Sequence, residues 1–515
     1  MSKNRFMCGW LMLAAMVVLS RAACAQWETI QPGFEYRKFT LSGPVEAFVV
    51  RMDVSNTTAQ QNNAIDSMIA QGQFYKTGLP NGGRETVSSM VNRYNDSVGY
   101  YWQTWGMRNR ILCAINGDYW ERETYPSGPY TGRPESGQVQ GGWFCRRYDE
   151  FSGGSGFLYS VWGVPAIGGD VVNGGGAAPQ KVIFADSSEV NLPKVNLERG
   201  SDDLVLYTPQ WANSTKTASG GVEVVMRVNR PALPLPHGTT SDSCVGTILE
   251  VRNGTGDAPI PFDCAVLSGT GSYAATLLSK CMVGQTIRLR MIVRDYGFSG
   301  RTPVHPPQDW TKAYGSIGVD REMLIASQIT NLPSPDATRD PRTGVAFNSS
   351  YVFFVVVDGR RSGSIGMTFG ELGLFMRDTL GATHGCSLDG GGSSAMWVEG
   401  RGIVNVPSDG SERATVNGLM MVAAQPLSKT LTFSGGAPVK TIASTPVRTG
   451  PGLNYPVLTT AGANQAGTIT SHSMNGARAS GQNWWLFSYG STSGWVTESS
   501  LQSNAGVSPA EFYLN

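Results

Sequence analysis

The chain has 515 residues, a formal net charge of +1, only 15% charged residues and 64 glycines. This length predicts more than one domain. The near-zero charge, without any basic run, excludes the electrostatic footprint of a nucleic-acid-binding protein. Because charged residues fall well below the roughly 25% of ordinary globular domains, long charged helices should be few. The composition therefore favours a chain rich in β structure, with some α.

The N-terminus has the pattern of an export signal. A short basic start precedes an apolar run, Phe6–Leu19, and small residues follow at Ala23–Ala25. This order is typical of a secretory signal peptide over residues 1–25, with cleavage before Gln26. No other segment approaches the ~20 apolar residues that a membrane-spanning helix needs. We expect a protein that is secreted, periplasmic or at the cell surface, without a membrane span.

Six cysteines remain after the signal peptide. They are Cys113, Cys145, Cys244, Cys264, Cys281 and Cys386. In an oxidising compartment this even count permits three disulfides, with fifteen pairings open. The spacing lacks the C-x-x-C pairs of zinc sites, so disulfides are the favoured role. No dedicated metal motif occurs; the pattern requires no cofactor and leaves a bound cation open.

Residues 26–110 read as irregular strands with one helix around Thr57–Gln71. An apolar run of strand length, Ile111–Ile115, then ends in the turn dipeptide Asn116-Gly117, followed by Asp118. The local pattern alone favours a buried strand and a tight turn. A site at this turn is the alternative.

The most informative region is 340–425. The apolar strand Tyr351–Val357 ends at Asp358. A helix then starts with an S/T-x-x-E capping box that places Glu371 at its third position, and Gly381 is suited to end it. The chain returns to a turn of Asp389 and three glycines, and a hairpin follows. Acids therefore stand at the ends of two predicted strands.

Several motifs in order resemble the phosphodiester glycosidase family, which contains N-acetylglucosamine-1-phosphodiester α-N-acetylglucosaminidase. They are Ala114–Trp120, Arg342–Thr343, Asp358–Arg360 with Gly366–Thr368 and Glu371, and Leu388–Ser394. The likeness covers roughly 110–425. It implies an enzyme that hydrolyses the bond between a sugar anomeric carbon and a phosphodiester oxygen. A free sugar of the N-acetylglucosamine type is released, and a phosphomonoester remains. The implied partner is a phosphate-linked glycan of an envelope or capsule.

The C-terminal part resembles a bacterial SH3 domain. The motifs are Val447–Gly452, Trp484-Trp485 and Gly494–Val496. The resemblance implies binding to cell-wall peptides or glycans such as peptidoglycan; a structural appendage without a ligand is the alternative. The expected order is a signal peptide (1–25), a glycosidase domain (26–425), a linker (426–440), an SH3-like domain (441–502) and a tail (503–515). We expect the α+β class, rich in β: a mixed-sheet catalytic domain with packed helices, plus a small SH3-like β-barrel.

The family resemblance assigns roles to residues. Asp389 is expected to act as a carboxylate on water or on the oxocarbenium ion, with Glu371 as its partner and Asp358 as a further catalytic candidate. The expected substrate-binding residues are Asn116, Gly117, Arg342, Thr343, Arg360, Gly390, Gly391, Gly392, Ser393 and Ser394. Structural alternatives stay open: Glu371 completes a helix cap, Asp358 starts a turn, and Arg360 is suited to a solvated turn. Asp389 could hydrogen-bond its own glycine turn.

Two other functions compete with the hydrolase. One is a non-catalytic envelope glycan-binding protein, and the other is a phosphodiesterase that cuts the P–O bond. The sequence leaves open the natural sugar and acceptor, retention or inversion at the anomeric carbon, disulfide pairing, metal dependence and oligomeric state.

Overall fold

The structure is a computed structural model. It describes residues 26–54, 65–71, 84–95, 109–120, 134, 138–140, 143–146, 156–160, 165–168, 180–212, 214–228, 243–261, 263–291, 313–330, 338–424, 429–452, 457–472, 474–479 and 482–504. The predicted signal peptide therefore lies outside the described residues. Within these ranges, no helix is long and apolar enough to cross a membrane.

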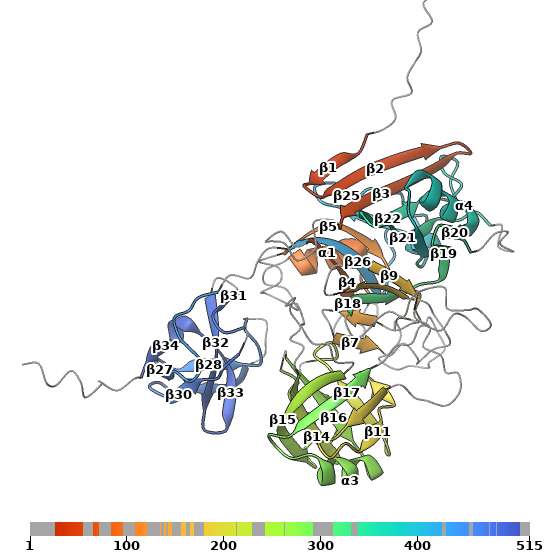
Figure 1. Ribbon diagram of the computed structural model, residues 1–515. Helices are drawn as coiled ribbons and strands as arrows, with labels where there is room; N and C mark the ends of the chain where they lie inside the picture. The colour runs from red at the N-terminus through yellow and green to blue at the C-terminus, as the bar shows by residue number, and fades with distance from the viewer. Residues whose placement is uncertain are drawn as a thin grey trace, which may run out of the picture.

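Strands dominate the described part of the chain and form five sheets (Figure 1). The helical elements there are short: α1 (Val87–Asn95), α3 (Gly271–Lys280), α4 (Phe369–Leu374), the π-helix η3 (Phe375–Thr379) and the 3₁₀ helices η4 (Gly391–Ser393) and η5 (Glu498–Ser500). The expected α+β class with packed helices is therefore wrong, and the fold is strand-rich with mostly antiparallel sheets. Most apolar runs pair as strands, and one helical segment, α4–η3, accounts for the strong helix signal in the region 340–425.

The N-terminal sheet combines three strands from the start of the described chain with strands between residues 321 and 387. Its strand order is β1 (Glu28–Gln31), β2 (Phe34–Leu41), β3 (Val45–Asp53), β22 (Tyr351–Val357), β21 (Arg342–Phe347), β23 (His384–Ser387), β19 (Arg321–Ile325) and β20 (Gln328–Ile329). All of its pairs are antiparallel. Residues far apart in the sequence therefore meet at the ends of β19, β21 and β23.

Two five-stranded sheets lie next to it (Figure 1). The β5 sheet has the order β25 (Gly402–Ile403), β24 (Met396–Val398), β5 (Asn109–Asn116), β26 (Asn417–Ala424) and β4 (Ile65–Gln71). The β18 sheet has the order β7 (Trp143–Arg146), β6 (Gln138–Gln140), β18 (Ala313–Gly318), β8 (Gly156–Ser160) and β9 (Pro165–Gly168). The predicted strand before Asn116 is thus confirmed as β5.

Two eight-stranded sheets complete the fold. The β14 sheet has the order β11 (Glu189–Asn191), β10 (Gln180–Ile183), β17 (Thr286–Met291), β15 (Ser243–Asn253), β14 (Val222–Val228), β16 (Cys264–Gly269), β13 (Leu204–Tyr207) and β12 (Lys194–Val195), of which β12 and β13 are parallel. The C-terminal sheet has the order β29 (Val457–Ala461), β28 (Thr445–Arg448), β33 (Thr492–Thr497), β32 (Gln482–Tyr489), β30 (Ala466–Ile469), β27 (Pro438–Thr441) and β34 (Leu501–Ser503), with β31 (Ala477–Ala479) on β32.

Strand β22 shows how the N-terminal sheet is buried on both faces. Successive side chains of a strand point to opposite faces. Phe354 accordingly belongs to the apolar cluster that includes Ile115 of the β5 sheet. Its neighbour Val355 belongs to the cluster that includes Leu372 of α4. The continuous apolar run of this strand therefore reflects packing on two layers, the β5 sheet and the α4–η3 segment.

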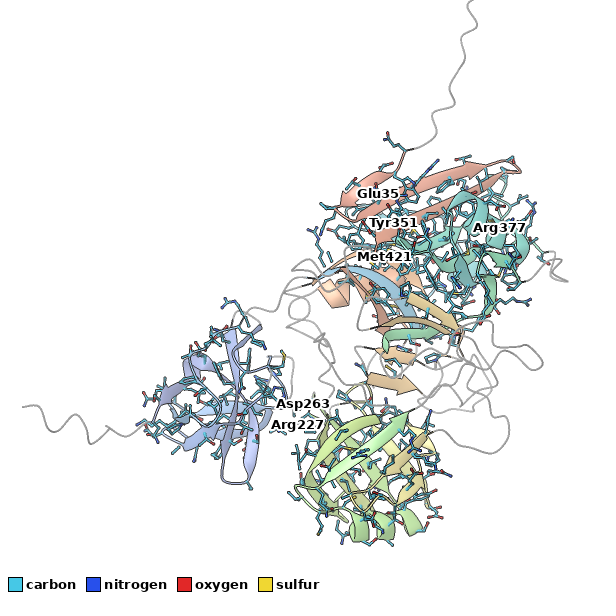
Figure 2. The ribbon with its side chains drawn as sticks, viewed as in Figure 1. Glu35, Arg227, Asp263, Tyr351, Arg377 and Met421 are labelled. Carbon is cyan, nitrogen blue, oxygen red and sulfur yellow. The ribbon has the colours of Figure 1, made fainter. Side chains whose placement is uncertain are left out.

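Strands β2, β3 and β22 of the same sheet carry a cluster of charged and aromatic side chains. Arg51 forms an ion pair with Glu35 at 2.6 Å, and its guanidinium lies 4.5 Å from the centre of the Tyr351 ring. Figure 2 shows Glu35 and Tyr351 in this part of the molecule. Cation–π contacts of this kind add to the strand pairing.

Two sequence predictions fail within the described residues. The helix expected around Thr57–Gln71 is wrong over β4, which pairs with β26 instead. Residues 57–64 lie outside the described part. The disulfide prediction also fails there, because five of the six cysteines are buried free thiols. Burial raises the pKa of Cys113 well above its usual value, so this thiol stays protonated. An even cysteine count does not report whether the side chains meet in space.

The C-terminal part of the chain contacts the β14 sheet through the carboxylate of Asp263, which lies just before β16. Asp263 lies 2.8 Å from Nε2 of His472 and 2.8 Å from Nε of Arg227. Figure 2 labels Arg227 and Asp263 on one side of the β14 sheet. Because Asp263 is only 2% exposed, this carboxylate joins the two sheets away from solvent.

Candidate active site

The turn at Asp389 is anchored by backbone hydrogen bonds to two other segments. The Asp389 N–H donates to the carbonyl of Gly117 at 3.0 Å, just after β5. The Gly391 N–H donates to the carbonyl of Pro341 at 2.9 Å, just before β21. The 3₁₀ helix η4 then leads the chain to β24. The turn is therefore fixed between the β5 sheet and the N-terminal sheet.

Asn116 holds the two ends of this turn together. Its Nδ2 donates to the carbonyl of Asp389 at 2.7 Å, and its Oδ1 accepts from the Ala395 N–H at 3.2 Å. Oδ1 also accepts from the Thr343 hydroxyl at 2.8 Å. Asn116 and Thr343 are both fully buried. This geometry favours a positioning role for these two residues, beneath the surface that a substrate would touch.

Tyr119 lies directly over the start of the glycine turn. Its hydroxyl lies close enough to the Gly390 backbone for that group to lower its pKa slightly. Burial raises the pKa of Tyr119 well above its usual value, and the charges of Asp320 and Asp389 raise it further, against the opposing effect of Arg342. The phenol therefore stays neutral at ordinary pH and can donate its proton in a hydrogen bond. The sequence motif included Tyr119 without giving it a role.

Arg342 lies next to the first glycine of the turn, Gly390. Its guanidinium lies 3.8 Å from the centre of the Phe369 ring, and its Nε donates to the carbonyl of Met367 at 3.0 Å. Burial lowers the pKa of Arg342, while the charges of Asp340, Tyr119 and Asp320 oppose that shift. An arginine remains charged despite such a change. The site therefore has a fixed positive charge close to the carboxylates of Asp340 and Asp320.

Two further guanidinium groups lie against the glycines themselves. A Cβ atom on Gly391 would lie 3.1 Å from Nη2 of Arg360, and one on Gly392 would lie 2.1 Å from Nη2 of Arg413. Nη1 of Arg413 also donates to the Ser393 hydroxyl at 3.3 Å. These close approaches, together with the positive φ of +60° at Gly391, explain why the turn needs glycines. Arginine forks near backbone N–H groups suit a phosphate.

The glycine turn has fewer N–H groups for a ligand than its sequence indicates. The Gly391 N–H donates to the carbonyl of Pro341 at 2.9 Å, and the Ser393 N–H donates to the carbonyl of Gly390 at 3.2 Å. The hydroxyl of Ser394 is buried and has no hydrogen-bond partner among the described residues.

Asp358 and Glu371 are occupied by other partners. Asp358 is fully buried and accepts hydrogen bonds from Arg361 at 2.6 Å, from the Val406 N–H at 3.0 Å and from Asn405 at 3.2 Å. Glu371 closes the capping box with Thr368, as predicted, and pairs with Arg339. The structure therefore brings Asn116, Gly117, Arg342, Thr343 and Arg360 together around Asp389–Ser394, with Asp358 and Glu371 held by neighbouring structural contacts.

Glu371→Gln is expected to leave turnover unchanged and to cost less than about 1 kcal/mol of unfolding free energy. Glutamine can still accept the Thr368 N–H of a capping box, but it cannot carry a catalytic charge. Sugar release and urea unfolding measure the two effects. Thr368→Ala is the control that removes the cap and costs about 1 kcal/mol. A loss of 100-fold or more, on the order of a missing general acid or base, would instead make Glu371 catalytic.

Among the described residues, no three His, Cys, Asp or Glu side chains come together as a metal site needs. The carboxylates around the turn are accompanied by arginines instead. The arrangement can hold an anion beside a buried carboxylate.

Residues 295–422 match the family model for phosphodiester glycosidases. This segment contains the Asp389 turn, the α4–η3 segment and most of the arginines described above. It leaves out the residues before 295, including Asn116 and Tyr119, which the fold brings to the same place. None of the curated proteins compared with the chain matches it.

Three solved structures have a similar chain path. A protein from Burkholderia pseudomallei that is described as an exported protein is 18% identical, with 73% of this chain and 74% of that chain covered and a TM-score of 0.45. A hypothetical protein from Synechocystis is 14% identical, with 78% and 64% covered and a TM-score of 0.47. The catalytic domain of zebrafish N-acetylglucosamine-1-phosphodiester α-N-acetylglucosaminidase, auto-inhibited by its pro-peptide, is 10% identical, with 77% and 86% covered and a TM-score of 0.35. Likenesses this distant carry no functional weight.

Proposed function

We propose that the chain is a secreted hydrolase that cleaves the sugar C1–O bond of sugar-1-phosphodiesters. The observation that supports this best is the buried carboxylate of Asp389 at the arginine-flanked glycine turn, within the segment that matches the glycosidase family. The products would be a free sugar and a phosphomonoester.

The chemistry of this bond fits the groups present. Glycoside cleavage passes through an oxocarbenium-like transition state that a carboxylate stabilises. A phosphomonoester, with its second pKa near 6, leaves far more readily than an alcohol. Strong protonation of the leaving group is therefore unnecessary, but its negative charge must be bound by positively charged groups. Arg360 and Arg413 are suited to bind this charge, because both guanidinium groups lie beside the turn that carries Asp389.

The finer features of the proposal rest on sequence motifs. The substrate class is a GlcNAc-1-phosphate-type glycan, export depends on residues 1–25, and the glycosidase domain spans 26–425. The SH3 resemblance of 441–502 stays a prediction. Nothing in the described residues supports the peptidoglycan binding that it implied, so the proposal is confined to the phosphate-linked glycan.

The full chain is expected to release sugar from methyl GlcNAc-1-phosphate diester and to leave methyl phosphate. In ¹⁸O-water the methyl phosphate should stay unlabelled, because the water oxygen goes to the sugar carbon. Mass spectrometry of the methyl phosphate measures this. Methyl α-N-acetylglucosaminide, which lacks the phosphate, is the matched control and should not be cleaved.

The other candidate functions give different results in the same experiment. Labelled methyl phosphate would mean P–O cleavage by a phosphodiesterase. Binding of the diester without any turnover would favour the glycan-binding protein over the hydrolase.

A further inference from the structure

Asp320 is an acid near the turn that no sequence motif includes. It lies between β18 and β19, and its side chain is 22% exposed. Its N–H donates to the carbonyl of Ser387 at 2.9 Å, and its Oδ2 lies 3.5 Å from the Ser387 hydroxyl. Ser387 is the last residue of β23. Asp320 is thus attached to the strand that leads directly into Asp389.

The direction of β23 places the two acids on one side of the chain. Leu388 still pairs with β21, since its N–H donates to the carbonyl of Thr343 at 2.9 Å. In an extended chain, residues two apart point to the same face. The side chain of Asp389 therefore points to the same face as that of Ser387, whose hydroxyl lies near the Asp320 carboxylate.

Tyr119 connects both acids in space. It lies two residues after Gly117, whose carbonyl accepts the Asp389 N–H, and the Gly390 backbone acts on its hydroxyl. Both Asp320 and Asp389 act electrostatically on this hydroxyl. A neutral phenol near two carboxylates can donate a hydrogen bond to one of them or to a bound sugar.

Three other acids around the turn are held closely by arginines. Asp358 lies 2.6 Å from Arg361, Asp340 lies 3.0 Å from Arg360, and Asp409 lies 2.8 Å from Arg413. The Asp320 carboxylate lies 3.8 Å from Nε of Arg321. A carboxylate held closely by a guanidinium is a weak proton acceptor, because the positive charge favours its ionised form. These three acids are therefore poorly suited to take a proton from water.

We propose that Asp320 is the second carboxylate of the site and takes the proton of the attacking water. The inference rests on the proposed function. Asp320 is open to water, whereas Asp389 is only 2% exposed and suits the stabilisation of positive charge on the sugar. The water oxygen bonds to C1 as the C1–O bond breaks. The electron pair of that bond leaves with the phosphomonoester, and the water proton goes to Asp320.

Asp320→Asn is expected to lower kcat on methyl GlcNAc-1-phosphate diester by about 10²–10⁴-fold, the usual contribution of a general base. KM should change little, and the acidic limb of the kcat/KM pH profile should disappear. Asp320→Ala should regain turnover in sodium azide, with a glycosyl azide as the product, because azide attacks without a base. Circular dichroism checks folding. Glu399→Gln is the matched control, since Glu399 is also 22% exposed and ion-paired, at the far end of β24.

Each outcome decides between the two proposals. An active wild type with an equally active Asp320→Asn overturns this inference alone. A loss that azide does not relieve, with an unchanged pH profile, also overturns it, because it would show only a structural role for Asp320. A folded wild type that cleaves no sugar-1-phosphodiester overturns the proposed function, and the role of Asp320 with it.

Discussion

Asp389→Asn is expected to lower sugar release by on the order of 10³-fold without unfolding the chain. The turn is held by the backbone N–H and carbonyl of Asp389, through Gly117 and Asn116, and asparagine keeps both. The substitution therefore removes the negative charge and leaves the shape. Sugar release from methyl GlcNAc-1-phosphate diester measures the loss, and circular dichroism measures folding.

Asp263→Asn is the matched control for that variant. Asp263 is also 2% exposed, but it lies just before β16 of the β14 sheet and bonds to Arg227 and His472. Its substitution should lower stability and leave the turnover of the folded protein intact. Folded Asp389→Asn protein with activity within tenfold of the wild type would refute the catalytic assignment of Asp389.

Local sequence signals predicted the elements around the site. The strand Tyr351–Val357 is present as β22, because seven apolar residues in a row suit a strand buried on both faces. The capping box at Glu371 and the helix stop at Gly381, with φ of +70°, are also confirmed. These features depend on neighbours in the chain, so a single sequence contains them.

Asp320 could not be found in this way. It follows a glycine and a valine after a short strand, which is an ordinary place for a turn aspartate. Its proximity to Asp389 arises from the pairing of β19 with β23, a contact between segments more than sixty residues apart. Tyr119 was visible in a motif, but its place over Gly390 depends on the bond between Asp389 and Gly117.

The fold class was misjudged for a related reason. Apolar residues at Ile65, Met68 and Ile69 fit a helical period as well as a strand. This segment forms strand β4 rather than a helix because it pairs with β26, which lies about 350 residues further along the chain. Helices are predicted too readily when the partner strand is distant.

Asp358→Ala is expected to lower the unfolding free energy by about 3 kcal/mol, as the removal of one partner of a buried ion pair does. The Asp358 side chain has no exposed surface, and its loss strands Arg361, Asn405 and the Val406 N–H. Urea unfolding measures the effect. Asp340→Ala is the comparison, because the pair of Asp340 with Arg360 is more exposed and should contribute less than about 1 kcal/mol.

The same variant separates a structural Asp358 from a catalytic one. Asp358 joins the end of β22 to the segment after β25, where Asn405 also donates to the carbonyl of Ser394 at 3.1 Å. A structural Asp358 therefore supports the glycine turn from the far side of Ser394. At a temperature where the variant is fully folded, its kcat should stay within about tenfold of the wild type.

Loss of turnover comparable to that of Asp389→Asn, with stability unchanged, would reverse this assignment and make Asp358 the catalytic partner. The reason is that a buried acid can lose its charge without a stability cost only if its neighbours do not depend on it.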